Sequence, residues 1–237
     1  MQKCVFILCM NILDSVFKRY RPSEDKLLKY GFIKQGEGYS YSFELNDGDF
    51  AVDLNVVGDN VLSKIIDKEF GDEFIGIDAE SYDGAFIGDL REEYKSKLEN
   101  IREECFFKVP FASNQSNRLV EFLYNTYGEK PDFPFEGGYE DAGVFRYRKN
   151  RKWYGIIMNI NKSLLTKKKG DVIRVDVLNV KINPEDREEL LKINGLYICY
   201  HMNKQKWISI ILDETVSDSI LFDLVSKSRE LIVNNKK

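Results

Sequence analysis

The chain has few of the residues that build most metal and redox centres. Its 237 residues include one histidine, His201, and four cysteines, Cys4, Cys9, Cys105 and Cys199. No two cysteines form a C-x-x-C pair, and with a single histidine there is no zinc-ligand set. Dispersed cysteines in a chain of this length are typical of reduced thiols and not of a disulfide framework. We therefore expect that the protein binds no metal and is cytoplasmic.

The motifs of common nucleotide-binding and catalytic sites are also absent. The sequence has no phosphate-binding loop and no dinucleotide fingerprint, and no carboxylate pair is set apart by its spacing. Cys199 and His201 lie two residues apart, as a thiol and its base would. The alternative is a buried structural cysteine beside a hydrogen-bonded histidine, which is the commoner arrangement. We expect no cofactor and no enzymatic activity.

No apolar run is long enough to cross a bilayer, which takes about 18–20 residues. The most apolar stretch is short and covers residues 5–10, close to Lys3. Three interpretations stay open: an ordered strand or helix end, an over-extended gene start with Met10 as the natural first residue, and a signal peptide, although no small-residue cleavage site follows. We expect no membrane partner.

What the chain does have is charge, and its distribution is uneven. With 43% hydrophobic and 31% charged residues it belongs to the globular class and is long enough for one large domain or two modest ones. The net charge of −4 is the sum of two unequal parts. Residues 1–111 include 14 basic and 22 acidic residues, a balance of −8, whereas residues 112–237 include 21 basic and 17 acidic residues, a balance of +4. This asymmetry predicts two parts, a smaller N-terminal unit over 1–111 and a second domain over 112–237.

In the first part, helices enclose a run of alternating strands. Apolar residues alternate on either side of Asn46-Asp47-Gly48, which is typical of antiparallel strands joined by a tight turn. The sequence predicts helices at 12–20, 25–30 and 90–105 and strands at 39–45, 50–56 and 61–67.

The second part repeats this organisation. Asn183-Pro184-Glu185-Asp186 is a helix start, with a capping side chain, a proline that needs no N–H and two carboxylates. The predicted helices are 116–127, 183–195 and one from Ser217 onward; the predicted strands are 143–149, 152–160, 172–182, 196–201 and 206–212. Antiparallel sheets flanked by helices make the expected fold class α+β.

Several motifs in this order resemble the MmcQ/YjbR family, over about 112–236. They are Phe133-Pro134-Phe135, Val144-Phe145-Arg146, Lys152-Trp153-Tyr154, Asn179-Val180-Lys181 with Pro184-Glu185, Tyr200-His201-Met202-Asn203-Lys204 before Trp207, and Ser226-Lys227-Ser228. The resemblance implies a CyaY-like, double-wing α/β sandwich and DNA binding, with 12–111 as the N-terminal extension of longer members. This chain departs from its relatives at Lys206, where a second histidine is frequent, so a role for paired imidazoles is in doubt.

The segment 146–181 is strongly basic. Eleven basic residues stand against only Asp171 and Asp176, a balance of +9, with Tyr147, Trp153 and Tyr154 interleaved. Cations for phosphates and rings for stacking are what a nucleic-acid surface needs. The alternative is a solvated hairpin whose aromatic rings face the core. The hypothesis of binding requires these cations to gather on one exposed face.

Alternation along two strands suggests a second feature. On strands, His201 and Asn203 would share one face, and so would Asn179 and Lys181. If the strands pair, these four side chains form one polar patch. The alternative is a hydrogen-bonded network that pins a turn, with Trp207 as a core anchor.

The sequence thus favours a non-enzymatic cytoplasmic protein that binds DNA through its basic C-terminal surface. Two alternatives remain: a protein-interaction or self-associating module, and a small-ligand pocket around His201 and Lys181. The candidate nucleic-acid-binding residues are Arg146, Arg148, Lys149, Arg151, Lys152, Arg174, Lys181, His201, Asn203 and Lys204.

Overall fold

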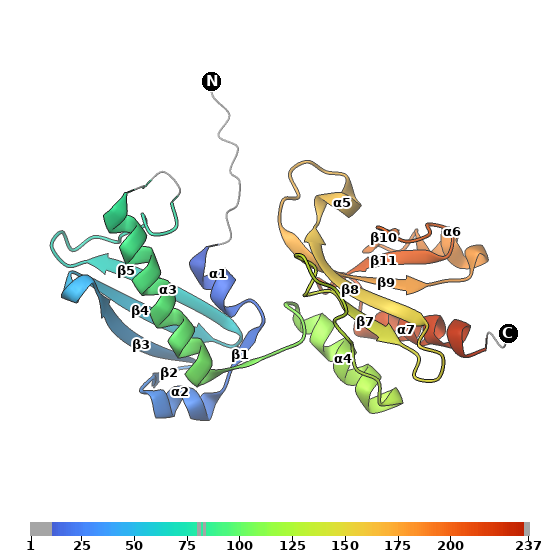
Figure 1. The fold of residues 1–237 in the computed structure, drawn as a ribbon, viewed down its shortest axis with the longest axis horizontal. Helices are drawn as coiled ribbons and strands as arrows, with labels where there is room; N and C mark the ends of the chain where they lie inside the picture. The colour runs from blue at the N-terminus through green and yellow to red at the C-terminus, as the bar shows by residue number, and fades with distance from the viewer. Residues whose placement is uncertain (1–10, 80–81, 83, 235–237) are drawn as a thin grey trace, which may run out of the picture. The chain divides into compact units, whose positions relative to one another are not determined.

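The computed structural model describes residues 11–79, 82 and 84–234. They form two compact units, one ending at Val109 and the other beginning at Pro110, which we call the N-terminal and C-terminal units. Each has its own sheet and its own hydrophobic core (Figure 1). The α+β class with antiparallel sheets and flanking helices is confirmed. The three interpretations of residues 5–10 concern a segment outside the described residues.

The N-terminal unit is a four-stranded antiparallel sheet, in the order β2-β3-β4-β5, crossed on one face by a long helix (Figure 1). The strands alternate as the sequence predicts, with Val52, Leu54 and Val56 buried against the helices. The predicted meander is present, and a small second sheet of β1 and β6 was not foreseen. The elements are α1 (Ile12–Phe17), β1 (Tyr20–Pro22), α2 (Glu24–Tyr30), β2 (Ile33–Gln35), β3 (Gly38–Leu45), η1 (Asn46–Gly48), β4 (Phe50–Val57), β5 (Asn60–Asp67), α3 (Ala85–Cys105) and β6 (Phe106–Lys108).

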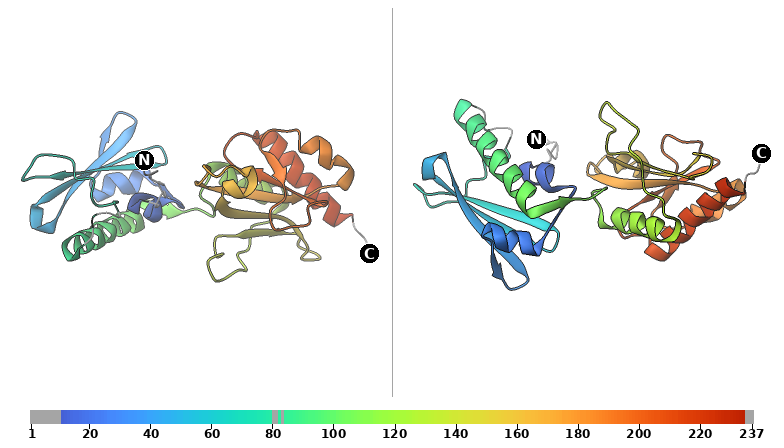
Figure 2. Two further views of the ribbon diagram at one scale, coloured as in Figure 1. Left: turned by 90° about the horizontal axis from the view of Figure 1, so that it is seen from above. Right: turned by 60° about the horizontal axis from the view of Figure 1, so that its bottom comes forward.

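The C-terminal unit is a five-stranded antiparallel sheet in the order β10-β11-β9-β8-β7, with α4 and α7 on one face (Figures 1 and 2). Its elements are α4 (Asn114–Tyr127), β7 (Gly143–Arg146), β8 (Trp153–Asn161), α5 (Ser163–Thr166), β9 (Arg174–Lys181), η2 (Pro184–Asp186), α6 (Arg187–Leu190), β10 (Leu196–Ile198), β11 (Trp207–Ile211) and α7 (Asp218–Val233).

Alternation along β9 explains how both faces of this sheet are used. Leu178 and Val180 face the helices and join the main core with residues of α4 and α7. Val177 lies in a smaller cluster with Ile211, to which Tyr200 packs from a loop. The face away from the helices is therefore partly covered by connecting loops.

In the C-terminal unit, three predicted elements differ most from the structure. The strand predicted at 196–201 ends at Ile198, because the Tyr200 N–H donates to the Ser209 hydroxyl at 3.0 Å and not to a backbone carbonyl of β11. A turn follows, in which the Asn203 side-chain oxygen accepts from the Gln205 N–H at 2.9 Å. The strand predicted at 143–149 ends at Arg146, where a bulge leads into the hairpin loop. The helix predicted over 183–195 is one turn of 3-10 helix followed by the four-residue α6.

Candidate functional site

The eleven basic residues of 146–181 do not gather at one place, contrary to expectation. The β7–β8 loop and the β8–β9 loop flank the same strand, β8, and therefore lie at its opposite ends. The register fixes this, since Gly155 pairs with Val180 and Asn161 pairs with Arg174. Nine residues of extended strand separate the two loops by about 26 Å at about 3.3 Å per residue. The end of β8 away from the β7–β8 loop, which we call the far end, carries Lys162, the three lysines 167–169 and Arg174.

At the near end, the hairpin loop 147–152 holds its cations outward. The loop is closed by two backbone hydrogen bonds, from the Tyr147 N–H to the Lys152 carbonyl at 3.0 Å and from the Arg151 N–H to the Tyr147 carbonyl at 2.9 Å. Arg148, Lys149 and Lys152 are exposed. A short closed loop has no interior for long charged side chains, so they extend into solvent.

Two further lysines come to the same end from neighbouring strands. Lys181 ends β9 and pairs across the sheet with Trp207, which begins β11 directly after Lys206. Within the described part of the chain, none of these side chains is in an ion pair. We call the following five residues the hairpin-end cluster: Arg148, Lys149, Lys152, Lys181 and Lys206.

Within this cluster, Lys152 and Lys206 lie close enough to Lys181 to act on its charge. Its side chain is half-buried, and its ammonium lies 5.2 Å from the centre of the Trp207 ring. Burial lowers the pKa of Lys181, and the charges of Lys152 and Lys206 lower it further. Among the described residues, no carboxylate forms an ion pair with Lys181 that would offset these effects. An anion arriving at this end of the sheet would therefore be stabilised.

Arg146 and Arg151, both predicted to hold phosphates, are instead engaged by a carboxylate. Asp132 accepts from the Arg146 Nε at 2.8 Å and from an Arg151 terminal nitrogen at 3.1 Å. The Arg146 guanidinium also lies 5.0 Å from the Trp153 ring. These contacts neutralise part of the charge that the sequence count assigned to the hairpin.

Arg174 does not belong to the site that the sequence predicted. It lies at the far end of the sheet, where its Nε donates to the Asn159 side-chain oxygen at 2.9 Å and a terminal nitrogen donates to the Asn159 carbonyl. Nearby, Lys162 pairs with Asp213 at 3.0 Å. The far end is therefore a separate basic surface.

A buried ionic network anchors the hairpin, and sequence reasoning missed it. Glu129 is 3% exposed and accepts from the Tyr154 hydroxyl at 2.9 Å, from the Arg229 Nε at 2.9 Å and from the Arg148 backbone N–H at 3.4 Å. Burial opposes ionisation of Glu129, but the bonds from Arg229 and Tyr154 outweigh it and hold its pKa below the usual value. The Arg229 guanidinium also stacks on Tyr147, at 5.0 Å. The network thus connects α7 to the base of the cation-bearing loop.

The interleaved aromatic rings are not available for stacking with nucleic-acid bases. Tyr154 is fully buried in the core beneath the helices. Trp153 is half-buried, with Arg146 over one face and Phe135 packed edge-on at 5.9 Å. Of the two interpretations, the one with aromatic residues facing the protein fits better.

The predicted polar patch of Asn179, Lys181, His201 and Asn203 does not form. Asn179 is fully buried; its amide donates to the Tyr200 carbonyl at 2.9 Å and its oxygen accepts from the Ser209 hydroxyl at 2.6 Å. This network pins the loop that follows β10, as the alternative interpretation proposed. Strand alternation does not apply to His201 or Asn203, because both lie in the turns after Ile198. Lys204 lies there too, and its carbonyl accepts from the Arg187 Nε at 2.8 Å.

Among the described residues, His201 has no partner suited to catalysis. It is exposed, has φ of +60° and lies against Tyr200, with ring centroids 4.0 Å apart. Cys199 is buried, its thiol donates to the Tyr200 carbonyl at 3.6 Å, and burial raises its pKa to about 11. A nucleophilic thiol needs the opposite shift, so the thiol–imidazole pair is wrong.

The two residues of the predicted pocket, His201 and Lys181, line separate hollows. Lys181 lines a groove beside α7, whereas His201 lines a separate hollow with Leu164 and Tyr197. Among the described side chains, no three of histidine, cysteine, aspartate or glutamate are grouped as metal ligands. None of the described helices is both long and apolar enough to cross a membrane.

Comparison with known proteins places the C-terminal unit. The YjbR family matches residues 125–231. The uncharacterised protein YyaQ of Bacillus subtilis is 36% identical over 115 residues, which are 48% of this chain and 93% of YyaQ.

Solved structures of similar proteins also cover about half of the chain. A crystal structure and a solution NMR structure from Pseudomonas syringae are each 34% identical and cover 50% of this chain, with 97% and 92% of their own chains and TM-scores of 0.46 and 0.45. A Deinococcus radiodurans protein is 23% identical, with coverages of 51% and 79% and a TM-score of 0.39. The family indicated by the sequence motifs is confirmed by the extent and identity of the match to YyaQ: the chain belongs to the YjbR family.

Proposed function

We propose that this protein is a non-enzymatic, cytoplasmic DNA-binding protein, and that the hairpin-end cluster contacts the phosphates of a duplex. The cluster combines a rigid, outward hairpin with cations from two neighbouring strands. Arg146, Arg151, Arg174, His201 and Asn203 are not part of the proposed contact surface.

The observation that carries the proposal is the unbalanced charge around Lys181. Two like charges, Lys152 and Lys206, act on a half-buried ammonium that has no ion-pair partner among the described side chains. Such an arrangement costs stability in the free protein, and a phosphate would offset it. Binding of phosphates releases counterions from DNA, which makes the affinity strongly dependent on salt.

The aromatic residues indicate how the nucleic acid would be held. Binding of single strands relies on exposed rings on which bases stack. Tyr154 is buried, and Trp153 is half-buried, with Arg146 over its ring and Phe135 against its edge. Contacts to the phosphate backbone are thus favoured over stacking, and they carry little sequence information by themselves.

Two features support the absence of catalysis and the cytoplasmic location. The Cys199 thiol stays protonated near neutral pH and lacks a base. Cys105 and Cys199 are both free, as in proteins of a reducing compartment.

The proposal is tested by titrating a fluorescein-labelled DNA duplex with the full-length protein and measuring anisotropy. If about five phosphates are neutralised, affinity should fall by roughly 10²–10³ between 50 and 200 mM salt. The double variant Lys152→Gln/Lys206→Gln removes two of the five cations. Its salt slope should decrease by about two, and its binding should weaken at every salt concentration.

The matched control is Lys167→Gln/Lys168→Gln, which makes the same charge change at the far end of the sheet. It should leave the salt slope unchanged. An equal effect of the two double variants would mean that only total charge matters, and the cluster would lose its role. Absence of binding to the duplex at 50 mM salt would refute the proposal as a whole.

A further inference from the structure

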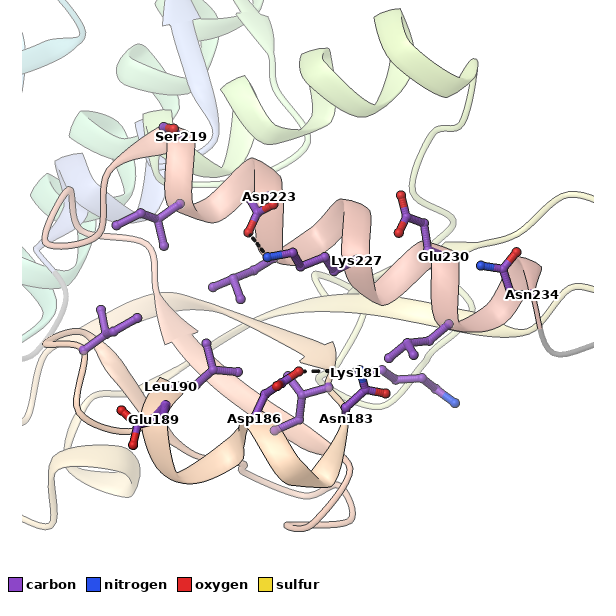
Figure 3. A pocket seen from close by; sticks show the side chains of 15 residues that line it. Lys181, Asn183, Asp186, Glu189, Leu190, Ser219, Asp223, Lys227, Glu230 and Asn234 are labelled. Atoms are coloured by element: carbon purple, nitrogen blue, oxygen red, sulfur yellow. Dashed lines mark hydrogen bonds and ion pairs between the residues drawn. The ribbon is translucent and has the colours of Figure 1, made fainter.

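A groove of about 880 Å³ lies in the C-terminal unit between α7 and the η2–α6 segment (Figure 3). It is independent of the hairpin-end cluster except for Lys181, which lies at its margin. One wall is formed by residues of 182–193 and the other by α7. Both walls belong to the C-terminal unit.

The groove follows α7 along its whole length. The residues that α7 contributes recur three or four positions apart, which places them on one stripe of the helix. The stripe runs from Ser219 to Asn234, about 22 Å at 1.5 Å per residue. A partner helix of about four turns would match this length.

The floor of the groove is apolar and extends the main core to the surface. Leu224 and Ile182 are buried, Leu190 and Ile193 are half-buried, and Ile220 is 39% exposed. Leu190 and Ile193 already pack against the core beneath α7. Covering this floor would remove apolar surface from water, which stabilises a complex by about 25 cal/mol for each Å² that is buried.

The rim of the groove is mainly acidic. Asp186 and Glu189 stand on the η2–α6 side, and Asp223 and Glu230 on α7, as Figure 3 shows. Two of these carboxylates are paired: Asp223 with Lys227 at 2.7 Å and Glu189 with Lys192 at 2.6 Å.

The surroundings of Lys227 show that the groove favours a cation. The hydrogen bond to Asp223 raises the pKa of Lys227, and the charges of Asp223, Asp186 and Glu230 raise it further. Glu230 itself has no ion-pair partner among the described side chains. Negative charge thus remains available at the rim.

We infer that this groove is a docking site for an amphipathic basic helix of a partner protein. The partner's apolar residues, at i, i+3, i+4 and i+7, would cover Ile220, Leu224 and Leu190. Its lysines or arginines would face Asp186 and Glu230. Charge selects the partner's chemistry, because an acidic rim attracts a basic helix and repels an acidic one.

The test uses a synthetic labelled peptide of roughly sixteen residues, with leucine at the helical i, i+3, i+4 and i+7 positions and lysine on the flanks. The control peptide has glutamate in place of every lysine. Binding to the full-length protein is followed by fluorescence anisotropy, and the site is mapped by amide chemical-shift changes. We expect saturable binding of the lysine peptide only, with shifts concentrated in 182–193 and 219–234.

Two variants examine the floor and the rim separately. Ile220→Asp places a charge on the exposed edge of the floor, and Glu230→Lys reverses a charge on the rim; each should weaken binding roughly tenfold, which corresponds to about 1.4 kcal/mol. Glu121→Lys makes the same charge change on the exposed face of α4 and should have no effect. Circular dichroism verifies that all three variants are folded.

Three outcomes would overturn the inference. The first is equal binding of the glutamate peptide, which would show that charge does not select the partner. The second is a set of chemical-shift changes outside the groove. The third is a concentration-dependent mass in light scattering that Ile220→Asp abolishes, since the occupant would then be a second copy of this chain.

Discussion

Replacing Arg229 by methionine should strongly destabilise the C-terminal unit, because it leaves a buried carboxylate without its cation. Glu129 is 3% exposed, and Arg229 donates to both of its oxygens, at 2.9 and 3.1 Å. Methionine retains the unbranched apolar stem that packs beside Tyr127 and Tyr147. The substitution therefore removes charge and hydrogen bonds while keeping most of the packing.

The expected loss is about 3 kcal/mol in the free energy of unfolding. Removing one partner of a buried ion pair costs roughly 3–5 kcal/mol. We take the lower end because the Arg229 side chain is 16% exposed and reaches solvent. The Tyr154 hydroxyl also continues to donate to Glu129.

The loss should depend on pH in a definite direction. In the wild type the pKa of Glu129 is held below its usual value, so its stabilisation is present near neutral pH and is lost as pH falls through that lowered pKa. Without Arg229, burial remains and should raise the pKa of Glu129 above the value of about 4.3 in the unfolded chain. The buried acid then becomes neutral as pH falls, so the difference between variant and wild type should shrink from pH 7 to pH 4.

Tryptophan fluorescence during urea unfolding is the suitable assay, because both tryptophans, Trp153 and Trp207, belong to the C-terminal unit. The double variant Glu129→Gln/Arg229→Met removes the unpaired charge and should recover part of the loss. A loss below about 1 kcal/mol, or one that is equal at pH 7 and pH 4, would refute this account of the network.

Two further predictions concern the loop after β10 and the thiols. Asn179→Leu should cost about 2 kcal/mol, because it leaves the buried Ser209 hydroxyl and Tyr200 carbonyl without their partner; urea unfolding measures this, and a loss under about 0.5 kcal/mol would contradict it. In a variant with Cys4 and Cys9 replaced by serine, an aromatic disulfide that reacts with thiols should label Cys105 and Cys199 at pH 8 only after urea is added. The reason is that burial raises the pKa of each thiol to about 11. Rapid labelling of the folded protein would contradict this prediction.

The alternating strands were largely predictable from the sequence. In a strand, every second side chain faces the core. The apolar residues at alternate positions, such as Phe50, Val52, Leu54 and Val56, therefore indicate a strand in the sequence itself. The ends of helices were predictable for a similar local reason. Gly128 ends α4 in the left-handed conformation that glycine adopts readily.

The extent of the site was less predictable, because charge counts carry no direction. Arg146 and Arg174 fall within one basic segment, yet antiparallel pairing places them at opposite ends of the sheet. The one signal available was that an antiparallel strand separates its two flanking loops. Applied to β8, that rule divides the basic segment without any coordinates.

The sequence by itself determined the α+β class, most element positions and the family, because these follow from local periodicity and from motifs in a fixed order. Tertiary structure alone decided which cations stay unpaired. Asp132 engages Arg146 from fourteen residues away and Glu129 engages Arg229 from a hundred, whereas Lys152, Lys181 and Lys206 form no ion pair with any described carboxylate. The strength of an electrostatic interaction depends on the distance between the charges in space. That distance is fixed only when the strands have paired in their register.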